Sequence, residues 1–257
     1  MEMDVPSHFL FGLERKNCQK RFIHSLKSDS AHVLSDHAAI HKHAVSFYNN
    51  LYKCEHQDEQ VIAQSFYTGL PQIKKESNVV LEADISAGEL YAALQSMQSG
   101  KTPGLDGLPV DFYTCFWSVI GEDLLAVLND SLANERLPLS CRRAVLTLLP
   151  KKGDLQLIKN WRPVSLLCTD YKLLSKVLAS RLSKVMEQTV YPDQTYCIPG
   201  RLIFDNIVLV RDLLEMSKLF DLKMGIFSID QEKAFVRVEH QYLWETLIAF
   251  GFYSWFY

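Results

Sequence analysis

Residues 144–154 read Ala144-Val145-Leu146-Thr147-Leu148-Leu149-Pro150-Lys151-Lys152-Gly153-Asp154. The apolar run before Pro150 has the composition of a buried strand, and Pro150 together with the Lys-Gly-Asp turn ends it. A second short strand is expected at residues 164–167, directly after Pro163. The sequence therefore predicts two short strands separated by a cationic turn.

Most of the chain around these strands has a helical pattern. Ser86 followed by Glu89 is a capping box before a helix through residues 90–97. The clearest helix covers residues 171–187, where apolar side chains form one stripe and the lysines lie away from it. Further helices are expected at residues 35–51 with Ser35 as the cap, and at 112–117, 124–132, 207–216 and 242–250. Residues 224–230 alternate with period two and predict a strand that ends in a carboxylate, so the expected fold class is mixed α/β (α+β) and helix-rich.

Composition places the chain among ordinary globular proteins, with 48% hydrophobic and 22% charged residues among 257. No apolar run approaches the ~18 residues of a membrane span, and the first residues do not resemble a secretory signal. The six cysteines form no CxxC pair and are expected to be reduced thiols. The expected location is intracellular, either nuclear or cytoplasmic, with no membrane partner.

Positive charge is concentrated in one part of the chain. Residues 136–184 carry eleven basic and two acidic side chains, a net charge of +9, so the remainder carries −12 in a chain whose total is −3. Such a concentration suits a polyanion such as nucleic acid. The alternative is a set of solvated helix faces that do not converge on one surface.

Two other motifs carry less weight. The triplet Gly100-Lys101-Thr102 invites a phosphate-loop interpretation, but that motif needs a glycine where Gln95 stands, and Pro103 disfavours the helix that should follow. Four histidines gather in the first helical region, and a solvated helix face accounts for them better than a zinc site because no cysteine accompanies them: His32, His37, His41 and His43.

A resemblance to a known protein family becomes specific at the end of the strand expected at residues 224–230. The segment reads Phe227-Ser228-Ile229-Asp230-Gln231-Glu232-Lys233-Ala234-Phe235. It resembles the first catalytic motif of reverse transcriptases from non-LTR (LINE-type) retrotransposons. Further blocks match that family in the family's order: residues 101–107 with 112–117, 149–154, 160–167, 170–172, 181–182, 193–194 and 200–206. The resemblance implies a helical linker segment at residues 1–80, and the fingers and an incomplete palm of a right-hand polymerase at residues 81–257.

The resemblance implies a role for each residue of the catalytic motif. Asp230 would be the catalytic carboxylate and a ligand of two Mg2+ ions, and the carbonyl of Gln231 could add an oxygen ligand. Phe235 would be the steric gate that fills the space of a ribose 2′-hydroxyl. The alternatives are a helix cap or turn for Asp230 and a core position for Phe235.

Other residues would contact the substrates in this family. Lys151 or Lys152, together with Arg162, would bind the triphosphate of a deoxynucleotide, and Gly200 and Arg201 would lie near the template. The implied partners are an RNA template, a DNA primer and deoxynucleotide triphosphates. For the three cationic side chains the alternative is simple surface solubility.

The sequence departs from the family pattern in ways that bear on activity. It contains no Asp-Asp pair, which the family carries in its second catalytic motif, and its last residue, Tyr257, follows soon after Asp230. One carboxylate cannot hold two dications about 3.5–4 Å apart. The chain is therefore expected to be truncated and inactive alone, with exposed apolar surface.

Tyr196-Cys197 stands where the family has Gly-Phe, and strain is expected if that backbone needs positive φ. The alternatives are a non-catalytic nucleic-acid-binding remnant and a decayed reading frame.

Overall fold

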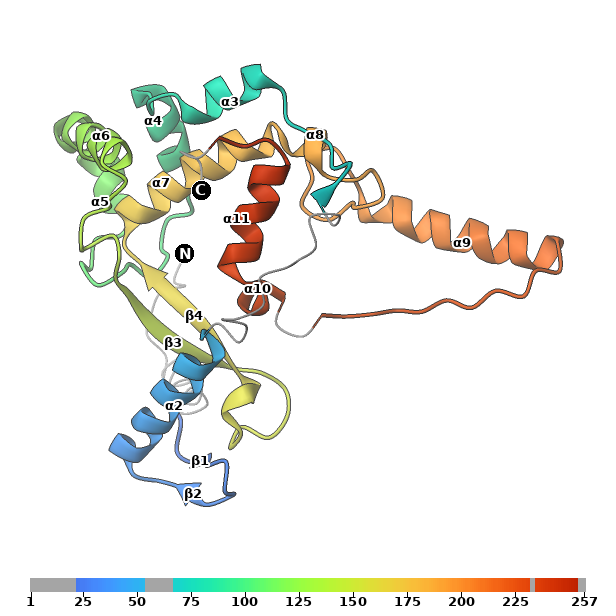
Figure 1. Cartoon of the computed structure of the whole chain (residues 1–257). Coiled ribbons are helices and arrows are strands. Elements are labelled where there is room, and N and C mark those ends of the chain that lie inside the picture. The colour runs from blue at the N-terminus through green and yellow to red at the C-terminus, as the bar shows by residue number, and fades with distance from the viewer. Residues whose placement is uncertain (1–21, 54–66, 232–233, 254–257) are drawn as a thin grey trace, which may run out of the picture.

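A computed structural model describes residues 22–53, 67–231 and 234–253. Figure 1 shows a helical layer (α3–α7) above a two-stranded hairpin (β3 and β4), a small N-terminal unit below it, and a long helix, α9, that projects sideways. The helix-rich α+β class predicted from the sequence is confirmed. The elements are β1 Leu26–Lys27, β2 Val33–Leu34, α2 His37–Leu51, α3 Lys75–Glu82, α4 Ala87–Gln95, α5 Val110–Cys115, α6 Trp117–Ala133, β3 Ala144–Pro150, β4 Trp161–Leu167, α7 Thr169–Ser183, α8 Met186–Thr189, α9 Ile203–Leu219, α10 Ala234–Arg237 and α11 His240–Ala249.

The largest core lies between helices α4, α5, α6 and α7. Leu90 and Leu94 of α4, Leu128 of α6, and Leu173 and Val177 of α7 are almost completely buried in it. The predicted capping box starts α4, because Ser86 accepts from the Glu89 backbone and Glu89 accepts from the Ser86 backbone. The apolar stripe of α7 thus packs as its spacing predicted.

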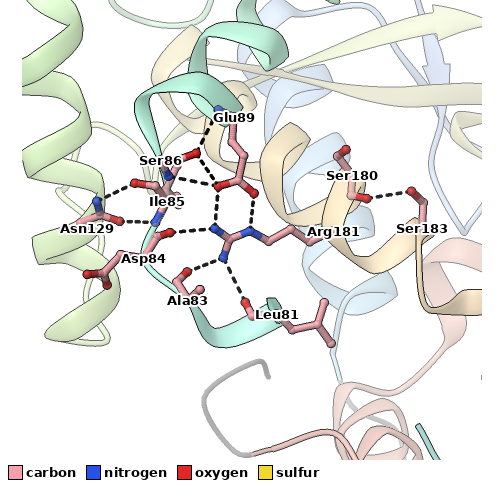
Figure 2. A network of polar contacts seen from close by, with 10 residues as sticks. All are labelled: Leu81, Ala83, Asp84, Ile85, Ser86, Glu89, Asn129, Ser180, Arg181 and Ser183. Atoms are coloured by element: carbon pink, nitrogen blue, oxygen red, sulfur yellow. Dashed lines mark hydrogen bonds and ion pairs between the residues drawn. The ribbon is translucent and has the colours of Figure 1, made fainter. Parts of the chain in front are cut away.

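Arg181, near the end of α7, joins this core to the segment between α3 and α4 (Figure 2). Its side chain is 2% exposed, and its guanidinium donates to both carboxylate oxygens of Glu89 at 2.8 and 2.9 Å. It also donates to the carbonyl oxygens of Leu81 at 3.1 Å, Ala83, and Asp84 at 2.9 Å. A buried guanidinium is tolerated here because its donors are satisfied.

A second, smaller core joins the N-terminal unit to the hairpin. Helix α2 contributes Ile40 and Tyr48, which pack with Ile158 and Trp161. The Tyr48 hydroxyl donates to the Trp161 carbonyl at 3.3 Å, and burial raises the pKa of Tyr48 to about 12, with Tyr52 adding to the shift. Residues 22–53 therefore contact the hairpin directly, while the division at residue 80 stays a prediction.

Three sequence expectations are wrong in detail. The helix expected over residues 171–187 is interrupted at residues 184–185, between α7 and α8. The cap of α2 is Asp36 rather than Ser35, since the Asp36 carboxylate accepts from the Ala39 backbone at 3.0 Å. Residues 224–230 form no strand; they run extended from the end of α9 towards α10 (Figure 1). A strand needs a hydrogen-bonded neighbour, and β3–β4 and β1–β2 are the pairs found in the described ranges.

Candidate nucleotide and nucleic-acid interface

The hairpin arranges its cationic side chains by strand register. Strands β3 and β4 are antiparallel, with Leu149 opposite Arg162 and Pro150 opposite Trp161. The Lys151 backbone continues the ladder by donating to the Asn160 carbonyl at 2.8 Å. Because side chains alternate between faces, Lys151 shares a face with Arg162, as its diagonal neighbour.

The two faces of the hairpin have different surroundings. Trp161, 3% exposed, and Leu148 lie on the face that packs against α2. Arg162, Lys151 and Leu149 lie on the other face, and all three are exposed. The hydrophobic contact with α2 therefore fixes which face presents the cations.

The turn between the strands is held by its own polar contacts. Gly153 has φ +112, a conformation that other residues rarely adopt, and a β-carbon there would lie 3.0 Å from the Asn160 amide. Lys27 forms an ion pair with Asp154 at 3.0 Å. A backbone hydrogen bond from Gln156 and the bond from Lys27 lower the pKa of Asp154. Lys152 lies in the bend itself, exposed and outside the ladder, so register favours Lys151 as the partner of Arg162.

The described residues of the segment 227–235 make no hydrogen bond or ion pair with the hairpin. Asp230 and Gln231 are exposed, and Asp230 has no hydrogen-bond or ion-pair partner within the described ranges. Phe235 lies in α10 and is 93% exposed, which is incompatible with a core position in this structure. Phe227 and Ile229 are 90% and 91% exposed.

The donor set around Asp230 does not by itself fit a pair of magnesium ions. A hard dication takes about six oxygen ligands, and several of them are carboxylates in two-metal sites. Among the described residues, a group of three possible metal ligands occurs elsewhere and does not include Asp230. Asp230 alone can supply one carboxylate ligand.

The predicted template residues lie in the turn before α9. The Arg201 guanidinium donates to the carbonyls of Val190 at 3.0 Å, Gln194 at 2.9 Å, and Tyr191. These hydrogen bonds hold the loop that precedes Arg201.

The same region contains two residues with positive φ. Gly200 has φ +78 with open space around it. The positive φ expected near Tyr196 falls on Cys197, at 60°.

The positive segment at residues 136–184 is partly internal. Arg181 is buried against Glu89, so it adds nothing to a surface for polyanions. Sequence reasoning missed this role, although the capping-box Glu89 offered a signal, since a carboxylate fixed at a helix start is a ready partner for a buried arginine. The exposed cations of the segment include Arg142, Arg143 and Lys176.

Comparison with known proteins identifies the class. Residues 149–257 match the family described as "Reverse transcriptase (RNA-dependent DNA polymerase)". That range begins at the end of β3 and contains the cationic turn, strand β4, Arg201 and Asp230. The chain thus contains part of a reverse transcriptase region.

Three relatives narrow the class further. The chain is 46% identical over 251 residues, 98% of its length, to an uncharacterized 149 kDa protein of transposon TX1 from Xenopus laevis. It is 28% identical over 169 residues, 65% of the chain, to a Pol polyprotein from retrotransposable element R2 of Popillia japonica, and 26% identical over 182 residues, 68% of the chain, to that of R2DM from Drosophila melanogaster. The reverse transcriptase region belongs to the non-LTR retrotransposon type. The chain spans only 19%, 22% and 17% of these three relatives.

No helix in the described part of the chain is both long enough and apolar enough to cross a bilayer.

Proposed function

We propose that this chain supplies the fingers of an RNA-directed DNA polymerase, and that the exposed face of the β3–β4 hairpin contacts the triphosphate of the incoming deoxynucleotide. The observation that carries this proposal is the register, which aligns Lys151 and Arg162 on one exposed face inside the family match. Arginine can bind two phosphate oxygens with its planar fork, while lysine adds a point charge. Lys152 is the less favoured of the two lysines, since it lies in the bend.

We also propose roles for the residues that would surround the reacting phosphate and the template. Asp230 would be one carboxylate ligand of the magnesium ions that such a polymerase uses, with the Gln231 carbonyl beside it. Magnesium would lower the pKa of the primer 3′-hydroxyl and stabilise charge on the leaving oxygens. Phe235 would exclude a ribose 2′-hydroxyl, and its exposure leaves the ring free for such a contact. Gly200 and Arg201 would approach the template through the backbone of their turn.

Primer–template binding tests the hairpin. Fluorescence anisotropy with an RNA template, a DNA primer and a deoxynucleotide is expected to show salt-dependent binding that weakens in the Lys151→Ala/Arg162→Ala variant. The salt slope is expected to fall by about 1 for each lost phosphate contact. The matched control is Lys74→Ala/Lys75→Ala, which removes two exposed lysines at α3. Equal weakening by both variants would overturn the assignment of the hairpin.

A binding module without chemistry is the second candidate, favoured because no group of three potential metal ligands among the described residues includes Asp230. Primer extension separates the two candidates. The 257-residue polypeptide contains no Asp-Asp pair and is expected to extend no primer with magnesium present. Extension that disappears in Asp230→Asn would show instead that this polypeptide has polymerase activity that depends on Asp230.

A further inference from the structure

A group of side chains outside the proposed interface has the composition of a metal site. Asp106, Cys168 and Asp170 each offer a ligand atom, and these atoms lie within 4.8 Å of one another. Asp106 comes from the loop after α4, while Cys168, the N-cap of α7, and Asp170, in its first turn, come from the junction between β4 and α7. Two parts of the chain that are distant in the sequence therefore converge at this point.

Close backbone packing brings the loop to this position. A β-carbon on Gly104 would lie 2.4 Å from the Cys168 backbone nitrogen, so only glycine allows the approach. The Thr169 hydroxyl donates to the Leu108 carbonyl at 2.8 Å, and Lys172 donates to the Thr102 carbonyl at 3.4 Å. The convergence is a packed contact between the loop and the start of α7.

Two buried side chains at this point have polar groups that make no hydrogen bond within the described ranges. Cys168 is 1% exposed and stands at the N-cap of α7, but its thiol makes no capping hydrogen bond there. Tyr113 is 6% exposed, and its hydroxyl has no hydrogen-bond partner among the described residues. Asp170, Asp106 and Cys168 all lie near enough to the Tyr113 hydroxyl to interact with it electrostatically. The Tyr113 oxygen is not among the buried side-chain atoms left without a partner, so it reaches solvent, whereas the Cys168 thiol is buried. A buried polar group usually has a partner, and a bound ion is one way to supply it.

We propose that Asp106, Cys168 and Asp170 bind one zinc ion, which fastens the 99–107 loop to the start of α7. Thiolate and carboxylate groups are common zinc ligands, and the thiolate disfavours magnesium and calcium, which prefer oxygen ligands alone. A water would complete the four-coordinate site.

A neighbouring thiol orients one of the ligands. The Cys141 thiol donates to one oxygen of Asp170 at 3.2 Å, and the Tyr171 backbone donates to the other oxygen at 2.6 Å. Such contacts from behind hold a ligating carboxylate in place. Cys141 is therefore a positioning residue in this proposal.

Cobalt titration of the chelator-treated 257-residue chain tests the site, because a thiolate bound to Co2+ gives a charge-transfer absorption band. We expect one Co2+ per chain with this band, and loss of the band when Zn2+ is added. Cys168→Ser should abolish the band, and Asp106→Asn should weaken binding at least about tenfold. The matched controls are Cys115→Ser and Asp123→Asn, which alter an exposed thiol and an exposed carboxylate.

Two results of this titration overturn the zinc site. One is absence of the band in the unaltered chain, and the other is a band that survives in Cys168→Ser. Asp106 is exposed, so Asp106→Asn is expected to keep the circular dichroism spectrum of the unaltered chain. Loss of metal binding in this variant would therefore not be caused by misfolding. Zinc should raise the melting temperature of the unaltered chain but not that of Asp106→Asn. The titration contains no nucleic acid, so its result is independent of the proposed polymerase role.

Discussion

Arg181 and Asp230 are both charged residues within blocks that resemble the same family, yet their surroundings are opposite. The Arg181 guanidinium is buried and bonded to Glu89 and three carbonyls (Figure 2). Asp230 lies in the extended segment 223–231, where every residue is exposed. A charged group acquires a defined geometry where the described chain supplies its partners. Asp230 has none of them within the described ranges, and the catalytic role proposed for it would require further metal ligands.

The largest effect is expected at the buried arginine. Arg181→Ala leaves Glu89 and three carbonyls without their donor, and we expect a loss of about 4 kcal/mol in the free energy of unfolding. Urea denaturation followed by circular dichroism measures it. Arg211→Ala is the control, because Arg211 pairs with Asp212 on the surface and should cost less than about 0.5 kcal/mol. Similar losses in both variants would contradict the importance of burial.

The next effect concerns the loop packed on α7. Gly104→Ala forces a β-carbon against the Cys168 backbone, and we expect a loss of about 2–3 kcal/mol. Gly88→Ala, in α4, meets nothing within 4 Å and should be neutral or slightly stabilising. Thermal melting of the two variants provides the test, and an unchanged Gly104→Ala melting temperature would refute the close contact.

Acid should weaken the same region through Glu89. Hydrogen bonding to Arg181 lowers the pKa of Glu89 from 4.5 to about 2. The stabilisation is therefore complete above about pH 5 and is lost as the pH falls towards 2. Glu89→Gln should cost about 2 kcal/mol at pH 7, a value reduced because the Glu89 side chain is 34% exposed.

The pH dependence of this variant distinguishes the cause. Urea denaturation at a series of pH values should show a shallower decline between pH 5 and pH 2 in Glu89→Gln than in the unaltered chain. An identical decline in both chains would mean that other carboxylates control acid unfolding.

The smallest effect is expected in the extended segment. Phe227→Ser and Ile229→Ser remove side chains about nine-tenths exposed, so unfolding free energy should change by less than about 0.5 kcal/mol. Solubility should rise, because exposed apolar side chains promote association. Leu173→Ala, at a fully buried position, should cost about 3 kcal/mol in the same denaturation series. A comparable loss for Phe227→Ser would show that the segment is packed.

Local patterns in the sequence predicted the elements whose partners lie close by. The Ser86–Glu89 capping box and the stripe of α7 needed only their own residues and one core. The choice of Asp36 over Ser35 as a cap is a one-residue shift between two residue types that both favour caps. The prediction of a strand at residues 224–230 was wrong. Alternation of apolar and polar residues specifies which side chains share a face, but it supplies no neighbouring strand for hydrogen bonding.

In the candidate site, too, the sequence predicted some features and only the structure showed others. Sequence resemblance selected Lys151, Lys152 and Arg162, but only the register distinguished the two lysines. Arg201 was predicted to lie near the template, which stays a prediction. The bonds from its guanidinium to loop carbonyls are a feature that no residue pattern signals. The convergence of Asp106 with Cys168 spans distant parts of the chain, so spacing in the sequence could not reveal it.

Hydrogen exchange with mass spectrometry, on the chain alone and with primer–template and deoxynucleotide, compares the packed and the exposed regions in one measurement. We expect slow exchange in α7 throughout, added protection at residues 144–167 on binding, and rapid exchange at 223–231 in the free chain, where the backbone has no hydrogen bonds within the described ranges. An unchanged hairpin on binding, or a segment 223–231 already protected in the free chain, would contradict this expectation.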